Sequence, residues 1–182
     1  MHRRDPHSER RLWQQTLDGV RLELARLPAA DRVRLAAQVA GIADLQVRLH
    51  ALSTAANGES LCRDCDGACC GCGRNHLTLG NLVAILLAGD EPPAPDFTAS
   101  CPWLGPRGCR LEPARRPFNC VTFICETIED RIEKADLEAF YELEKALRGV
   151  YRDLAGRYAG AGLQGLLLRA EGLGGRGFFS GT

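Results

Sequence analysis

This chain is organised around a cysteine-rich segment that begins Cys62-Arg63-Asp64-Cys65-Asp66-Gly67-Ala68-Cys69-Cys70-Gly71-Cys72. All nine cysteines lie in the first group or in a second group, which comprises Cys101, Cys109, Cys120 and Cys125. Thiolates bind soft metal ions and iron–sulfur clusters better than they serve most other roles. Glycines interrupt both groups and give the backbone the freedom to turn tightly around a metal. The segment therefore predicts a bound metal.

The composition and the N-terminal sequence predict a soluble protein whose cysteines are kept reduced. A chain of 182 residues is long enough for one compact domain with its own core. Its 23 basic and 23 acidic side chains balance, so the net charge gives no reason to expect nucleic acid or a membrane surface as a partner. The N-terminus lacks the apolar run of a secretory signal, and the apolar run 83–88 is too short to cross a bilayer. We therefore expect a cytoplasmic protein, in which an odd number of cysteines indicates metal binding rather than a disulfide framework.

Two helices are expected before the cysteines. Apolar residues recur at helical spacing from Trp13 to Leu27, and Pro28 helps to end this helix. A second stripe runs from Leu35 to Leu52, after an N-cap at Asp31 and before a stop at 57–58. Because so few residues separate them, the two helices are expected to pack as an antiparallel hairpin.

The rest of the chain also reads as mainly helical. We expect a short helix over 79–87 capped by Thr78, a proline-rich connection over 90–95, a long helix from about Thr127 to Tyr158, and a last short helix over 163–170. The predicted fold is a mainly α helical bundle packed around two irregular cysteine-rich loops. Its expected parts, within one compact domain, are a helical hairpin (1–58), a metal-binding region (59–125), the C-terminal helices (126–170) and a flexible glycine-rich tail (171–182).

The cysteine spacing fits no familiar metal-binding template. Cys62-x-x-Cys65 can chelate one metal, and the competing thioredoxin-like dithiol would need a βαβ context that is not predicted here. The neighbouring Cys69 and Cys70 point opposite ways in an extended segment, so they would serve different metals, or one would coordinate while the other packs. The second group is spread out, unlike zinc ribbons and ferredoxins. Each of its cysteines is therefore expected to lend a single ligand to a site completed by the first group.

Other side chains near the cysteines are candidates for supporting roles. The segment 107–116 carries four arginines against one glutamate; Arg110 and Arg116 are expected to stabilise the negative charge of a thiolate-bound cofactor, the alternative being ordinary solvated arginines. His76 is a possible imidazole ligand, whereas surface positions are expected for His2, His7 and His50. The carboxylates of Glu129 and Glu133 share a helical face, but a solvated face is favoured over an iron site because no Glu-x-x-His accompanies them.

The order of these motifs resembles a known family. The combination Cys62-x-x-Cys65-x-x-x-Cys69-Cys70, Leu77-Thr78-Leu79, Cys101-Pro102-Trp103-Leu104, Cys109, Arg116-Pro117 and Cys120 is similar to the CxxCxxCC, or YkgJ-like, family of zinc- or iron-chelating cysteine-cluster proteins. The resemblance covers about a third of the chain, roughly 61–125.

Carried over position by position, the resemblance implies a set of metal ligands. They are Cys62, Cys65, Cys69, Cys70, Cys101, Cys109 and Cys120. Three residues rather than two separate Cys65 from Cys69, and Cys72 and Cys125 lie outside the shared pattern. Family members have been described as iron–sulfur proteins, and a related cysteine domain occurs in flagellin lysine methylases, although no methyl-donor site is visible in this chain.

Three hypotheses about function follow. The first is an iron–sulfur protein used for electron transfer or to support modification chemistry, with a redox partner. The second is a structural zinc protein whose metal pins the loops onto a helical bundle for binding a partner protein. The third is an enzyme with a substrate pocket beside the cluster. No set of catalytic residues is recognisable, so whether the chain is an enzyme stays open.

Overall fold

The computed structural model describes residues 5–64, 76–106 and 108–182, and of residues 62–64 it describes the backbone alone. The prediction of a mainly α fold is confirmed. The helices are α1 (Pro6–Arg26), α2 (Ala29–Ala55), α3 (Gly58–Asp64), α4 (Leu79–Leu87), the 3-10 helix η2 (Pro113–Arg115), α5 (Phe118–Thr122), α6 (Glu126–Glu129), α7 (Lys134–Ala155) and α8 (Leu166–Gly172). Two short strands, β1 (Leu104–Gly105) and β2 (Gly108–Cys109), form an antiparallel pair in which Leu104 faces Cys109.

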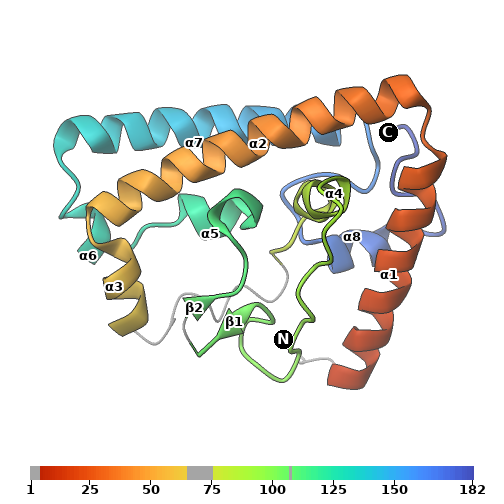
Figure 1. The fold of residues 1–182 in the computed structure, drawn as a ribbon, viewed down its shortest axis with the longest axis horizontal. Helices are drawn as coiled ribbons and strands as arrows, with labels where there is room; N and C mark the ends of the chain where they lie inside the picture. Colours follow the sequence, from red (N-terminus) through yellow and green to blue (C-terminus); the bar gives the residue numbers. More distant parts are fainter. Residues whose placement is uncertain (1–4, 65–75, 107) are drawn as a thin grey trace.

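The two longest helices, α2 and α7, lie side by side and run in opposite directions (Figure 1). Each buries one apolar stripe, as its helical periodicity predicts. On α2 the stripe includes Leu35, Val39, Ile42 and Leu49, and on α7 it includes Phe140, Leu147, Tyr151 and Leu154. This pair covers one side of the molecule, and the smaller helices and the second cysteine group lie beneath it (Figure 1).

The predicted antiparallel packing of the first two helices is wrong. α1 and α2 meet at a corner and run in clearly different directions, so that α2 packs on α7 whereas α1 packs on α8 (Figure 1). Only Leu27 and Pro28 separate them, and both residues have extended backbone conformations. Such a short extended joint redirects the chain without laying one helix back on the other. The α1 stripe instead reaches Trp103, which Trp13 meets edge-on with ring centroids 5.3 Å apart.

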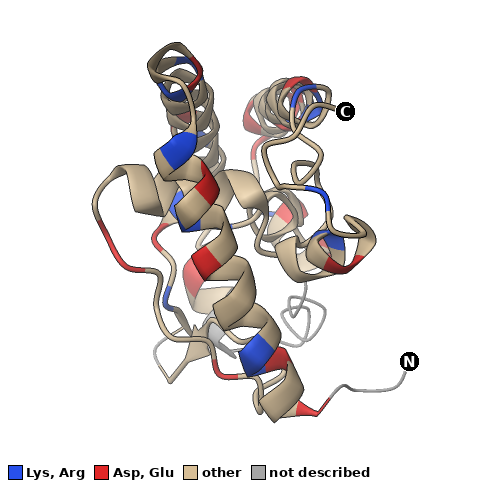
Figure 2. Cartoon of the chain, turned by 90° about the vertical axis from the view of Figure 1, so that its right-hand side faces the viewer, with Lys and Arg blue, Asp and Glu red and all other residues tan. Residues whose placement is uncertain are grey.

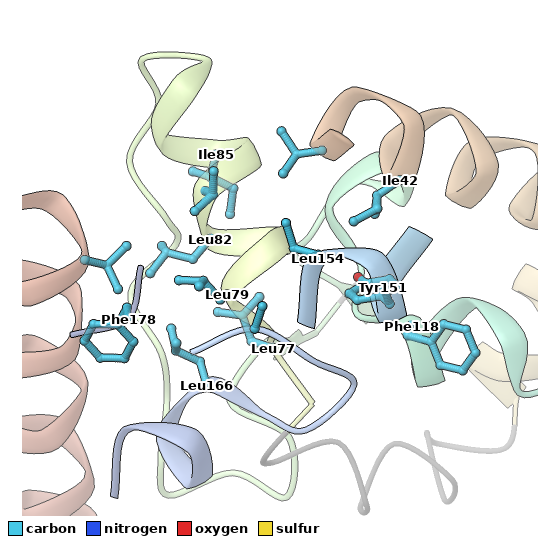
Figure 3. Close-up of a cluster of buried hydrophobic side chains, with 14 of the residues drawn as sticks. Ile42, Leu77, Leu79, Leu82, Ile85, Phe118, Tyr151, Leu154, Leu166 and Phe178 are labelled. Carbon is cyan, nitrogen blue, oxygen red and sulfur yellow. The ribbon is translucent and has the colours of Figure 1, made fainter. Parts of the chain in front are cut away.

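Helix α4 occupies the centre of the core (Figure 3). Its predicted start is confirmed: the Thr78 hydroxyl accepts a hydrogen bond from the Asn81 amide, and the Asn81 side chain accepts one from the Thr78 amide. This capping box satisfies amides that would otherwise be buried without partners. Leu79, Leu82 and Ile85 are each at most 1% exposed, so α4 is covered on nearly all sides.

The long C-terminal helix begins later than the sequence predicts. A break at 130–133 separates α6 from α7, and the backbone there makes short i to i+3 hydrogen bonds, from Arg131 to Ile128 and from Ile132 to Glu129. Carboxylates crowd this stretch, and like charges four residues apart destabilise a helix. Ile128 is buried on α6, which turns that short helix toward the core.

The glycine-rich end of the chain is packed, although it forms neither helix nor strand after α8. The Gly160 amide donates to the Phe178 carbonyl, and the Phe179 amide donates to the Glu23 carboxylate on α1. Phe178 is 8% exposed and belongs to the main core. The segment expected to be a flexible tail over 171–182 instead joins α1 to the end of α7, because Phe178 is buried in the core and the half-buried Phe179 packs against Tyr158.

Charged residues of both signs alternate along α1, which lies toward the viewer in Figure 2. This distribution matches the balanced composition of the chain. Among the described helices, none combines the length and the apolar character needed to span a membrane.

Candidate functional site

The predicted metal ligands fall partly inside the described structure. Cys65, Cys69 and Cys70 lie outside the described residues, as does Cys72, and Cys62 is described only as a backbone position on α3. The second group is described in full. Cys101 is buried, Cys125 is half-buried, and Cys109 and Cys120 are exposed.

The hairpin of β1 and β2 brings Cys101 and Cys109 near one another. Cys101 precedes β1 and is 7% exposed, while Cys109 lies on β2 opposite Leu104. Burial raises the pKa of the Cys101 thiol, and the neighbouring Cys109 raises it further, whereas hydrogen bonds from backbone amides and the charge of Arg110 act in the opposite direction. A buried thiol of this kind needs a bound cation or another strong stabilising group before it becomes a thiolate.

Arg110, which the sequence predicts to support a thiolate-bound cofactor, lies at this hairpin. Its guanidinium donates to the Pro102 carbonyl at 2.6 Å, and its backbone amide donates to the Trp103 carbonyl at 2.8 Å. These bonds fix the guanidinium beside the Cys101-Pro102-Trp103 turn. Arg107 lies outside the described residues.

Cys120 lies beside His76. The Cys120 sulfur and the His76 Nδ1 are 3.7 Å apart, although 44 residues separate them in sequence. Cys120 is on α5, which is anchored by Phe118: this ring is 3% exposed and meets Tyr151 edge-on at 5.7 Å. His76 is half-buried just before the α4 cap, and burial lowers its pKa, which favours the neutral imidazole that can accept a hydrogen bond or bind a metal.

A buried polar network fixes the chain immediately before α5. The Arg116 carbonyl accepts two hydrogen bonds, from Gln46 Nε2 at 2.6 Å and from Asn81 Nδ2 at 3.1 Å. The Tyr151 hydroxyl donates to Asn81 Oδ1 at 3.3 Å and accepts from Gln46 Nε2 at 3.2 Å. Side chains of α2 and α4 thus converge on one carbonyl oxygen, and Tyr151 of α7 holds both of them in place. Burial raises the pKa of Tyr151 to about 12, so the phenol keeps its proton throughout the ordinary pH range.

The side chain of Arg116 is expected to face a thiolate-bound cofactor, but it contacts His50. Its Nε donates to the Leu111 carbonyl at 3.0 Å, and one terminal nitrogen lies 3.3 Å from His50 Nδ1. The other nitrogen of His50 lies 3.1 Å from a Glu59 carboxylate oxygen on α3. The prediction of a surface position for His50 is wrong, since its side chain is only 19% exposed. The Arg116 side chain is therefore held by His50 and by the Leu111 carbonyl of the same segment.

Sequence reasoning missed the residues that hold this arrangement. Gln46 and Tyr151 lie within the apolar stripes of α2 and α7, where a polar side chain is the visible signal. Asn81 follows Thr78 at the third helical position, where a capping side chain is common. His50 follows Gln46 by four residues, so both lie on the same face of α2. These signals indicate buried polar contacts, but they do not identify the partners.

The described residues do not by themselves form a complete metal site. Across 5–61, 76–106 and 108–182, where side chains are described, no three His, Cys, Asp or Glu residues are grouped so that they could hold a metal ion. Comparison with models of known protein families, with curated proteins and with solved structures gave no match.

Proposed function

We propose that this chain is a metal-binding cysteine-cluster protein of the CxxCxxCC type, and that it holds an iron–sulfur cluster for electron transfer or to support modification chemistry. The observation that carries metal binding is the contact of Cys120, from the second group, with His76, which follows the first group in sequence. The choice of an iron–sulfur cluster rests on the number of thiols in the family pattern. The remaining ligands of this site would come from the first group, and the pair Cys101 and Cys109 would contribute ligands as the family pattern implies.

The distance between the two atoms fits a shared metal. A tetrahedral metal with sulfur at about 2.3 Å and nitrogen at about 2.1 Å separates these two ligand atoms by about 3.6 Å. The distance from the Cys120 sulfur to His76 Nδ1 is 3.7 Å. The same distance also suits a weak hydrogen bond between a thiol and an imidazole, so the experiment below must separate the two cases.

Zinc is the second candidate, and the imidazole at Cys120 is the observation that favours it. Structural zinc sites commonly combine three thiolates with one histidine, whereas most iron–sulfur clusters are held by four thiolates and only Rieske-type centres use histidines. A zinc ion would supply folding energy to the loops instead of redox chemistry. In that case the chain would present its helical surface to a partner protein.

Anaerobic purification followed by a visible spectrum and metal analysis tests the proposal. Iron with acid-labile sulfide and broad visible absorption is the expected result. A colourless protein with stoichiometric zinc would replace the first candidate with the second. A protein that contains neither metal, even after reconstitution with each, would overturn both.

Single substitutions then test the ligand set. Cys65→Ser, Cys120→Ser and His76→Gln are expected to lose most of the bound metal, because each removes one ligand atom. Cys125→Ser and Cys72→Ser are the matched controls, since both cysteines lie outside the shared family pattern, and they should keep it. Full metal retention by Cys120→Ser and His76→Gln would mean that this pair is only hydrogen-bonded.

A further inference from the structure

His50 joins parts of the chain that belong to the two cysteine groups. On one side its Nε2 faces Glu59, in the first turn of the helix that carries Cys62. On the other side its Nδ1 faces the guanidinium of Arg116, four residues before Cys120. Among the described residues, these are the two charged groups that the structure places against the ring, and the Thr54 hydroxyl lies 3.4 Å from Nε2.

The partners determine the protonation state of the ring. A guanidinium has only donors, so His50 Nδ1 must offer a lone pair to Arg116. Nε2 then carries the hydrogen and donates it to the Glu59 carboxylate. The neutral imidazole satisfies both partners, whereas a second hydrogen on Nδ1 would point at a cation and remove the bond to Arg116.

We propose that His50 is a pH-sensitive positioning residue: in its neutral form it links the first-group helix α3 to the segment that precedes Cys120, and mild acid breaks this link. This link does not depend on the function proposed above. Loss of the Arg116 contact leaves the Arg116 carbonyl held by Gln46 and Asn81. Acid therefore frees the Arg116 side chain from His50, while the backbone at Arg116 stays in place.

The electrostatics give the direction of the pH effect. Burial lowers the pKa of His50 below 6.5, and the positive charge of Arg116 lowers it further, while Glu59 raises it. The unfolded chain, with the ordinary pKa, binds the proton more readily than the folded chain does. Folding stability from this group is therefore complete above about pH 6.5 and declines as the pH falls below it.

An NMR titration of the imidazole signals in the purified full-length protein tests the proposal, with the His50 signal identified by its absence in His50→Gln. Arg116→Gln should raise the titration midpoint of His50, and Glu59→Gln should lower it. Arg115→Gln is the matched control, because it removes the same charge from the neighbouring residue, which pairs with Asp90 instead. An unchanged midpoint in Arg116→Gln, or an equal rise in Arg115→Gln, would overturn the proposal.

Thermal unfolding provides a second measurement that needs no assignment. Glutamine can donate to Glu59 and accept from Arg116 without titrating, so His50→Gln should fold and should lose less stability than the natural protein between about pH 7.5 and pH 5.5. Equal losses would contradict the proposed role of the ring. The natural protein and the variant are compared at the same metal content, so a failure here is distinct from a failure of the metal analysis.

Discussion

The helical scaffold and the second cysteine group are held together in different ways. The scaffold consists of apolar stripes on α1, α2, α4 and α7 that are almost fully buried. The segment 101–125 is instead anchored by the residues between its cysteines: Trp103, Leu111 and Phe118 are buried, and the Arg116 carbonyl is gripped by side chains of the scaffold. Cys109 and Cys120 stay at the surface. The difference indicates that the thiols of Cys109 and Cys120 are not needed to close the core, which leaves them available for chemistry, whereas Cys101 belongs to the core.

The largest effect should come from damage to the scaffold. Leu154→Ala removes a side chain with no exposed surface, whose Cδ2 atom reaches toward Gly80 on α4, and should lower the free energy of unfolding by about 2–5 kcal/mol. Urea unfolding followed by circular dichroism measures this loss. The metal content of the fraction that remains folded should not change, because Leu154 supplies no metal ligand and its side chain reaches toward α4, which carries no cysteine.

The matched control for this change is Leu22→Ala on α1, where the side chain is 52% exposed. Its effect on the free energy of unfolding should stay within about 0.5 kcal/mol. If Leu22→Ala and Leu154→Ala were equally harmful, the assignment of the core would be wrong.

An intermediate effect is expected where the scaffold grips the cysteine segment. Tyr151→Phe removes a buried hydroxyl and leaves the amides of Gln46 and Asn81 short of one partner, at a cost of about 1–3 kcal/mol. Tyr141→Phe removes an exposed hydroxyl that bonds to Glu129, and it should change stability by less than about 0.5 kcal/mol. Denaturant midpoints at neutral pH compare the two variants directly.

Alkaline pH offers a further readout of the same hydroxyl. The pKa of Tyr151 is raised to about 12, above the ordinary value of 10, so its contribution to stability is complete below about pH 10 and is lost as the pH rises toward 12. Tyr151→Phe should lack this part of the alkaline loss. The same loss of stability in both proteins would show that the phenol is not buried as described.

The sequence predicts the scaffold better than the site because the two depend on different information. Stripes such as Leu35 to Leu49 and the Thr78 cap follow from the local periodicity and capping rules that residues near in sequence obey. The angle between α1 and α2 does not follow from local rules, because it depends on the other helices against which each of the two packs. Trp13, for example, is buried by Trp103, ninety residues away in the numbering.

The candidate site depends even more on such distant contacts. The cysteine pattern identifies the thiols, but the contact of Cys120 with His76 arises only when α5 and the start of α4 are packed together. The same holds for His50, which the sequence presents as one polar residue on a long helix. Its role follows from Glu59 and Arg116, which approach it from two other elements. Pairwise chemistry of this kind has no local signature in a single sequence.

The smallest effect is expected at the exposed thiol of the hairpin. Cys109→Ser in chelator-treated protein should change the free energy of unfolding by less than about 0.5 kcal/mol, because the side chain is already in water. Cys101→Ser places a hydroxyl in a buried, largely apolar position and should cost about 1–3 kcal/mol under the same conditions. With metal bound, the proposed function predicts that Cys109→Ser also becomes destabilising, since metal binding energy adds to folding energy. Urea unfolding with and without chelator separates these terms: a Cys109→Ser penalty that is equal in both conditions would assign Cys109 a packing role, whereas a penalty only in the metal-loaded protein would identify it as a ligand.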